Sequence, residues 1–414
     1  PATVEQKNAP WELAFYDQKT ASYQRILLRD ATFLQEKEED FDVVYTFATE
    51  QEDYRNAVQH LALQYSQYIR WKMEDDDAAL AEEMTGYPAE QDAFHLESLE
   101  EQKKVWFSGI TKETFVALQN SAAGSGQPIE LALELDRPEW YKAYLSMESA
   151  VFFDAYFRRN QIADPPVFHP DRLYIGNAFC PHLAPTEEEL FALMDKACRE
   201  SFSITLTFPF LLEENLTETQ ARLQHLARWC EQKNKTIEIV VNDWGTAHLA
   251  AQLPVFSLCL GVLLNKRKKD PRMAYKLGKR TLFEQNSVHA AFYQEYLKEE
   301  FRMERYEWES CGDTSTRKFP EGKNSMHLPF YQTNTSQYCP LYAACTKGSR
   351  GAQTPVRKCH RFCEEQAFLY PEHLRMMGRY NSLFGIDLSI LQEPEAMGKM
   401  YGLRGIDRIV VNLL

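Results

Sequence analysis

The chain has 414 residues, a formal net charge of −14 at pH 7, and nine cysteines. This length allows two domains with separate cores, and no apolar run is long enough to span a membrane. The acidic balance argues against nucleic acid as the main partner, because that affinity depends on neutralised phosphates. One basic run, residues 265–272, is a candidate anion-binding patch, and a solvated loop is its simpler interpretation. The first residues lack the pattern of a secretory signal, so a cytoplasmic location is expected.

The first 165 residues are expected to form a helix-rich α/β domain of unknown role. Residues 41–47 (FDVVYTF) indicate a strand, and residues 51–73 indicate an amphipathic helix. Residues 128–135 (PIELALEL) predict a further strand, and residues 140–159 predict a helix with a thick aromatic face. No catalytic constellation is recognisable in this part of the sequence.

Asp164-Pro165-Pro166 has the composition of a linker, so a second domain is expected over residues 166–414. Strands and helices then alternate at short spacing, which predicts a TIM-barrel-like α/β sheet, complete or incomplete. The expected strands are residues 172–179, 203–210, 236–242, 256–264, 304–309, 326–333 and 406–412, and the expected helices are residues 186–200, 217–233 and 246–253. In such barrels the chemistry gathers where strands end, and Cys180, Asp243 and Asn265 stand at such ends.

Four cysteines crowd into one short segment with the spacing C-x5-C-x13-C-x3-C. They are Cys339, Cys345, Cys359 and Cys363. Thiolates bind soft or borderline metals, so this segment predicts an iron–sulfur cluster or a structural zinc. The spacing matches neither a paired CxxC zinc ribbon nor a ferredoxin run, and it does not choose between the two metals. Arg357, Lys358 and Arg361 lie close by in sequence and would offset an anionic cluster.

An ordered series of strand-end pieces runs from Arg172 to the C-terminus. The pieces are RLYIGNAFC, IVVNDWG, LGVLLNKRKKDPR, RYEWES, MHLPFYQTNTSQYC and IDRIVVN. In their order and spacing they resemble the collagenase-like peptidase family, family thirty-two of the unassigned peptidases. Members of that family include proteins similar to oxygen-independent hydroxylases of ubiquinone synthesis and of RNA, which carry a four-cysteine [4Fe–4S] cluster. The N-terminal part does not match the family's barrel.

The resemblance implies a cluster with one ligand at the end of an early barrel strand and three ligands much later. In this sequence the ligands would be Cys180, then Cys339 or Cys345, then Cys359 and Cys363. The strand directly before Cys339 favours that residue, whereas the gap of thirteen residues before Cys359 favours Cys345. Zinc stays the alternative metal.

The resemblance also implies a substrate pocket at the barrel mouth, lined by Asp243, Asn265, Glu307 and His327. Of these, Asp243, Glu307 and His327 are the candidate catalytic residues, although such side chains also serve as hydrogen-bonding scaffold. The leading expectation is an enzyme or enzyme subunit in oxygen-independent hydroxylation-type redox chemistry on a small molecule. The alternatives are a peptidase-like hydrolase of peptides with structural cysteines, and a non-catalytic subunit that docks a protein partner. No Ser/His/Asp or Cys/His arrangement is recognisable, which counts against the peptidase.

Overall fold

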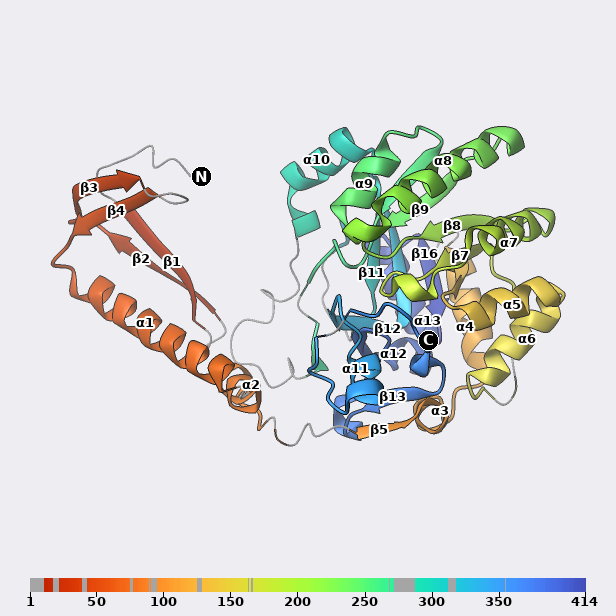
Figure 1. Ribbon diagram of the computed structural model, residues 1–414, viewed down its shortest axis with the longest axis horizontal. Helices are drawn as coiled ribbons and strands as arrows, with labels where there is room; N and C mark the ends of the chain where they lie inside the picture. Colours follow the sequence, from red (N-terminus) through yellow and green to blue (C-terminus); the bar gives the residue numbers. More distant parts are fainter. Residues whose placement is uncertain are drawn as a thin grey trace. The chain divides into compact units, whose positions relative to one another are not determined.

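The protein is divided into two compact units, which are each described separately. The first ends at Glu90 and the second begins at His95, as far as the chain is described (Figure 1). The computed structural model describes residues 11–17, 22–38, 43–74, 77–88, 90, 95–124, 129–162, 164, 167–267, 269–271, 287–311, 318–353 and 355–414. Within these ranges, every helix is too short or too polar to cross a membrane.

The first unit contains two antiparallel hairpins followed by two helices. Strand β1 pairs with β2, and β3 pairs with β4. The strand expected at residues 41–47 and the helix expected at 51–73 are both present. Strand β3 was not predicted, and it is exposed along nearly its whole length and shows no apolar face. The elements are β1 (Trp11–Asp17), β2 (Ser22–Leu28), β3 (Thr32–Glu38), β4 (Val43–Ala48), α1 (Glu52–Met73) and α2 (Asp77–Thr85).

The second unit is built on a closed barrel of eight parallel strands, in agreement with the TIM-barrel-like expectation. Neighbouring strands pair in chain order, and the last strand closes the barrel by pairing in parallel with the first. The barrel strands are β6 (Glu130–Leu135), β7 (Arg172–Gly176), β8 (Ser203–Thr207), β9 (Ile237–Val241), β10 (Phe256–Leu260), β11 (Arg305–Glu309), β12 (Lys323–Thr335) and β16 (Arg408–Asn412).

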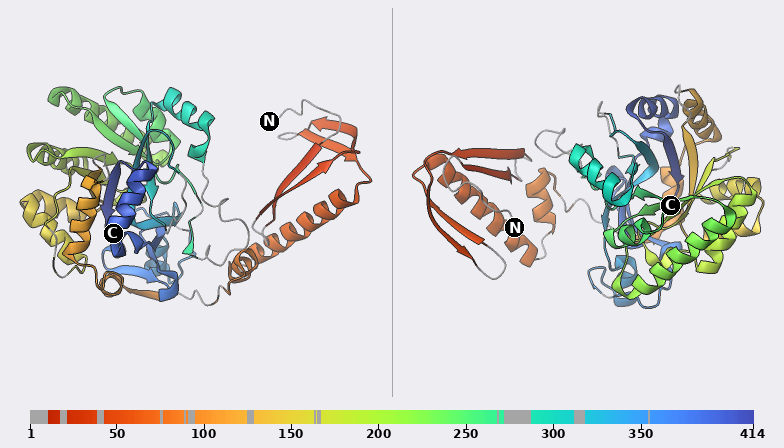
Figure 2. Two further views of the ribbon diagram at one scale, coloured as in Figure 1. Left: turned by 180° about the vertical axis from the view of Figure 1, so that it is seen from behind. Right: turned by 90° about the horizontal axis from the view of Figure 1, so that it is seen from above.

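Helices cover the outside of the barrel, as the views from behind and from above show (Figure 2). Helix α7 begins with a capping box, in which Thr186 and Glu189 satisfy each other's backbone N–H groups. The single helix expected at residues 140–159 is two helices, since the backbone turns extended at Met147 and Glu148. The helices are α3 (Leu99–Trp106), α4 (Lys112–Gly124), α5 (Pro138–Ser146), α6 (Ser149–Arg159), α7 (Glu187–Arg199), α8 (Leu216–Lys233), α9 (Trp244–Ala251), α10 (Ala291–Phe301) and α13 (Pro394–Arg404).

The domain boundary expected at residue 165/166 is wrong. Strand β6 precedes that point, yet it pairs with β7 on one side and with β16 on the other. Without β6 the barrel would be open, so the chain from His95 onward belongs with it. Asp164 lies in the connection between α6 and β7, and the two prolines that follow it, Pro165 and Pro166, are outside the described residues.

The connection between β12 and β16 is long and carries a small sheet of its own. Strand β12 continues past the barrel and pairs antiparallel with β15, and the sheet continues through β14 and β13 to β5. Cys339, Cys345, Cys359 and Cys363 all lie in this connection. Its elements, with the early strand that joins its sheet, are β5 (His95–Ser98), α11 (Pro340–Lys347), β13 (Gln366–Leu369), β14 (Met376–Arg379), β15 (Ser382–Ile386) and α12 (Ser389–Gln392).

Candidate functional site

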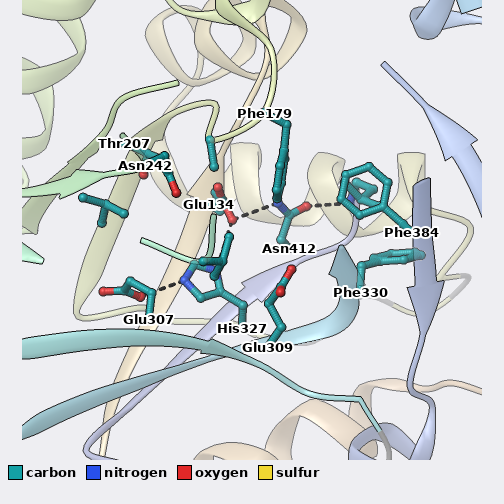
Figure 3. A pocket seen from close by; sticks show the side chains of 14 residues that line it. Glu134, Phe179, Thr207, Asn242, Glu307, Glu309, His327, Phe330, Phe384 and Asn412 are labelled. Atoms are coloured by element: carbon teal, nitrogen blue, oxygen red, sulfur yellow. Dashed lines mark hydrogen bonds and ion pairs between the residues drawn. The ribbon is translucent and has the colours of Figure 1, made fainter. Parts of the chain in front are cut away.

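A pocket opens inside the barrel at the carboxyl ends of the strands (Figure 3). Its volume is about 30 Å³, which suffices for one or two water molecules. Charged and amide side chains converge on it from five barrel strands, and aromatic rings from the β12–β16 connection and the loop after β7 form one wall. The lining residues are Glu134, Ala178, Phe179, Thr207, Val240, Asn242, Val262, Glu307, Glu309, His327, Phe330, Phe384, Asn412 and Leu414.

His327 lies between two carboxylates at the centre of this pocket. Its Nε2 atom is 2.8 Å from Glu307 Oε2, and its Nδ1 atom is 3.5 Å from Glu134 Oε2. Burial alone would lower the pKa of His327, but hydrogen bonds and charge from the two carboxylates raise it to about 10. His327 is therefore an imidazolium at neutral pH, able to donate a hydrogen bond or a proton but not to act as a base.

Glu307 is held as a carboxylate by a network below the pocket. It is fully buried, and it accepts hydrogen bonds from Tyr174 and Ser325 as well as from His327. Burial alone would raise the pKa of Glu307, yet His327 and nearby arginines lower it. The Tyr174 hydroxyl in turn accepts from Arg408 at 2.8 Å. The pocket floor is thus a fixed array of charges rather than an apolar layer.

Two further groups give the pocket its polar character. Glu309 forms a buried ion pair with Lys269, and its other oxygen accepts from the Gln332 N–H at 2.6 Å. Thr207 Oγ1 is buried and has no hydrogen-bond partner within the described residues. An unpaired buried hydroxyl costs free energy, so this atom is suited to a ligand or a water. The ion pair also shows that Lys269, from the basic run 265–272, faces inward rather than forming a solvated loop.

A larger hollow lies beside the pocket, between the loops that follow β7 and β8. Its volume is about 410 Å³, within the range of small-molecule sites. Pro181 and His182, directly after Cys180, line it, and Phe208 follows the pocket residue Thr207. The small pocket holds the converging buried charges, and the hollow next to it has the room for an organic ligand.

The structure brings the early cysteine to the late ones. Burial and the nearby Cys363, Cys339 and Cys359 raise the pKa of the Cys180 thiol. Cys339 and Cys359 likewise act on Cys363, whose pKa burial raises to about 12. Cys345 raises the pKa of the Cys339 thiol, but it is not among the main causes of the raised pKa values of Cys180 and Cys363. Cys180 is therefore within electrostatic reach of Cys339, Cys359 and Cys363.

In the described part of the chain, no three His, Cys, Asp or Glu side chains are already close enough to hold one metal ion. The four thiols are near neighbours rather than a formed metal cage. Their donor chemistry is still uniform, with four sulfurs from two distant segments. No disulfide joins any of the nine cysteines.

The turn between β14 and β15 connects the cysteines to the pocket. Tyr380 has a positive φ of 57°, and its carbonyl accepts a hydrogen bond from Cys339 Sγ at 3.1 Å. Asn381 Nδ2 donates to the carbonyls of Phe179 and Ser336, each at 2.7 Å. Phe179 lines the pocket and precedes Cys180, so one turn fixes both cysteine segments. A non-glycine residue in this left-handed region is held there by its surroundings.

Buried cations lie beside this turn. Arg379 is 2% exposed and donates from Nε to the Cys363 carbonyl at 3.1 Å. Arg137 is 3% exposed and pairs with Asp136 at 3.1 Å. Burial, with the charges of Arg137 and Arg379, holds the pKa of Lys103 well below its usual value. Two buried arginines therefore lie beside this turn, and only Arg137 has a carboxylate partner among the described residues.

The candidate residues from the sequence divide into two groups. Glu307 and His327 line the pocket and contact each other, as expected for a site. Asp243 does not line it: this residue caps α9, accepting from Thr246 N at 2.8 Å and from Leu211 N at 3.0 Å. Asn265 is buried and donates to the Glu307 carbonyl at 2.8 Å, which makes it a support of β11.

Several pocket residues were not predicted from the sequence, although a pattern in the sequence could have indicated them. Glu130, Ala132 and Glu134 alternate along β6, a period-two pattern that places both glutamates on one face. Asn412 ends the run IVVN at residues 409–412, which repeats the IVVN ending at the pocket residue Asn242. No sequence pattern indicates Arg379, because only the geometry of the turn brings its side chain to Cys363.

Fold and site together define an eight-stranded parallel α/β barrel with a charged pocket and a group of cysteines at its mouth. Compared with family models, curated proteins and solved structures, the chain has no match.

Proposed function

We propose that the barrel unit binds a [4Fe–4S] cluster through Cys180, Cys339, Cys359 and Cys363. The protein would then be an enzyme or enzyme subunit in oxygen-independent hydroxylation-type redox chemistry on a small molecule. The observation that supports this proposal is that Cys180, after the end of β7, is close enough to Cys339, Cys359 and Cys363 of the β12–β16 connection for their charges to affect its pKa, next to a buried charged pocket. The resemblance to the collagenase-like peptidase family points in the same direction.

The residues present suit this group on two grounds. Four sulfur donors, without an imidazole among them, are the usual ligand set of such clusters. A thiolate-bound cluster is anionic, and the buried Arg379 beside Cys363 supplies positive charge where few carboxylates are present. When bound, the cluster would supply one-electron transfer at the mouth of the barrel.

The pocket residues bind and orient a substrate in this proposal. His327 is a cation between two carboxylates and would donate a hydrogen bond or a proton to an oxygen of the substrate. Thr207 Oγ1 is a free polar contact, and Phe179, Phe330 and Phe384 exclude water from one side. Glu134, Glu307 and Glu309 outnumber the cations His327 and Lys269, so the pocket favours a neutral ligand over an anion.

The peptidase alternative finds less support in this geometry. A hydrolase would need a base or nucleophile at the pocket, and an imidazolium between two carboxylates is not a base at neutral pH.

The test is anaerobic purification followed by metal, sulfide and absorption analysis. Iron and acid-labile sulfide in near-equal amounts, with a broad band near roughly 400 nm that fades on reduction, are the expected result. The Cys180→Ser protein, prepared in parallel, should lack the band. Stoichiometric zinc without sulfide in the wild-type protein would overturn the proposal.

A further inference from the structure

Arg379 is a buried cation that has no carboxylate partner among the residues that the structure describes. Its side chain lies at the end of β14, is 2% exposed, and donates from Nε to the Cys363 carbonyl at 3.1 Å. Its Nη1 atom is buried and has no hydrogen-bond partner within the described residues. A guanidinium removed from water is costly unless an anion or acceptors meet it. A negatively charged group close to Arg379 would therefore stabilise the folded protein.

Asp136 is the buried carboxylate that acts on Arg379 in the described part of the chain, and it is already engaged. Asp136 accepts from Arg137 at 3.1 Å and from the Tyr380 hydroxyl at 3.0 Å. The Arg379 guanidinium packs over the Tyr380 ring at 4.9 Å, and this contact holds it in place without neutralising it. Arg137 has a second carboxylate, Glu139, at 3.5 Å, whereas Arg379 has none in the described part of the chain.

We propose that Arg379 is a positioning residue that supplies the countercharge of the cysteine-bound cluster and raises its reduction potential. The inference rests on the proposed function, because the missing anion is taken to be the iron–sulfur cluster. Reduction adds negative charge to a cluster, and a fixed positive charge in a dry environment stabilises the reduced form more than the oxidised one. The unpartnered Nη1 is the atom available to donate to a cluster sulfur.

The basic residues that are near in sequence cannot fill this role as well. Arg361 is 42% exposed in its side chain and forms an ion pair with Glu364. Arg357 and Lys358 are exposed as well. Water and salt screen exposed charges, so their effect on a buried cluster is small. Arg361, only two residues from Cys363, is thus a matched control for the loss of one positive charge.

The experiment compares Arg379→Gln, Arg379→Lys and Arg361→Gln with the wild-type full chain, each purified anaerobically. Iron and sulfide content is measured first, and the midpoint potential is then obtained by titration followed by absorption. Arg379→Gln should shift the potential to more negative values and lose the cluster to a chelator several-fold faster. Arg379→Lys should recover part of the shift, and Arg361→Gln should match the wild type.

The outcomes separate this inference from the proposed function. Wild-type protein without iron and sulfide would refute the proposed cluster itself. Wild-type and Arg379→Gln proteins with full clusters and equal potentials would overturn the role of Arg379 alone. If Arg379→Gln holds no cluster, Arg379→Lys decides: a retained cluster supports the countercharge, and a second empty protein shows that the shape of arginine, not its charge, is needed.

Discussion

The Nε2 atom of His327 lies 2.8 Å from Oε2 of Glu307, inside the barrel and between adjacent strands. Strands β11 and β12 pair so that Glu309 is opposite His327, which places Glu307 one inward-facing position earlier. Two residues that are 20 positions apart in the chain thus form a buried ion pair. Their contact fixes the charge of the pocket, and it can be tested by titration and by substitution.

His327 should make the stability of the protein depend on pH in the alkaline range. Its folded pKa of about 10 exceeds the ordinary value of 6.5, so the folded state holds the proton more tightly. The stabilising contribution is complete below pH 6.5 and is lost as pH rises through 10, with a slope of at most about 1.4 kcal/mol per pH unit. Urea unfolding across this range should show the decline in wild-type protein and a flatter profile in His327→Gln. Equal profiles would contradict the ion pair.

Removal of the carboxylate alone should be more damaging than removal of the pair. Glu307→Gln leaves His327 with one distant carboxylate in a buried site, and we expect a loss of about 3–5 kcal/mol in unfolding free energy. The double variant Glu307→Gln, His327→Gln should be less destabilised than the sum of the two single changes. Additive losses, measured by urea unfolding near neutral pH, would show that the two side chains do not interact.

The cysteines should separate into ligands and core residues. Serine at Cys180, Cys359 or Cys363 should abolish or destabilise the cluster, and Cys339→Ser should be severe where Cys345→Ser is mild. Cys230 and Cys259 are fully buried, Cys230 in the apolar core and Cys259 inside the barrel, and serine at either position should leave the iron content unchanged at a modest cost in stability. Iron per chain is the measurement. A full cluster in Cys180→Ser would break the link between β7 and the late connection.

Two shortened chains test where the barrel domain begins. A chain starting at Val167 lacks β6, so the barrel would have two open edges, and we expect an insoluble product. A chain starting at His95 keeps all eight barrel strands together with β5, and it should fold on its own. Circular dichroism and cooperative thermal unfolding distinguish them. A cooperative fold in the Val167 chain would show that β6 is dispensable.

Asp243 should prove to be a structural residue. Its side chain accepts from the Thr246 N–H and hydroxyl and from the Leu211 N–H, so Asp243→Ala should cost about 0.5–2 kcal/mol of stability. Asp243→Asn, which can still cap α9, should cost less. Both are measured by urea unfolding. An unchanged stability with a large loss of substrate binding would restore Asp243 to the site.

Much of the barrel could be predicted from the chain because its strands are short and largely buried, and helices alternate with them over residues 172–260. All seven strands expected after residue 166 exist, and each has a boundary within a few residues of the prediction. The first strand, β6, was also recognised as a strand, but the prolines at 165 and 166 suggested a boundary after it. The composition of a short segment indicates only whether that segment is stiff and exposed. Whether β6 belongs to the barrel depends on its pairing with β16, at the far end of the chain.

By itself the sequence determined the order of the barrel strands after residue 166 and the cysteine segment, because both follow from local pattern and residue chemistry. Glu307 and His327 came from the family resemblance, and the structure places both in the pocket. Only the tertiary structure decided that Cys180 meets the late cysteines, that Asp243 caps a helix, and that Glu134 joins His327. It also decided that the buried charge beside Cys363 comes from Arg379 rather than from Arg357, Lys358 or Arg361. These relations depend on distance and burial, and both arise from barrel closure and the folding of the β12–β16 connection, which bring together residues with no common local pattern.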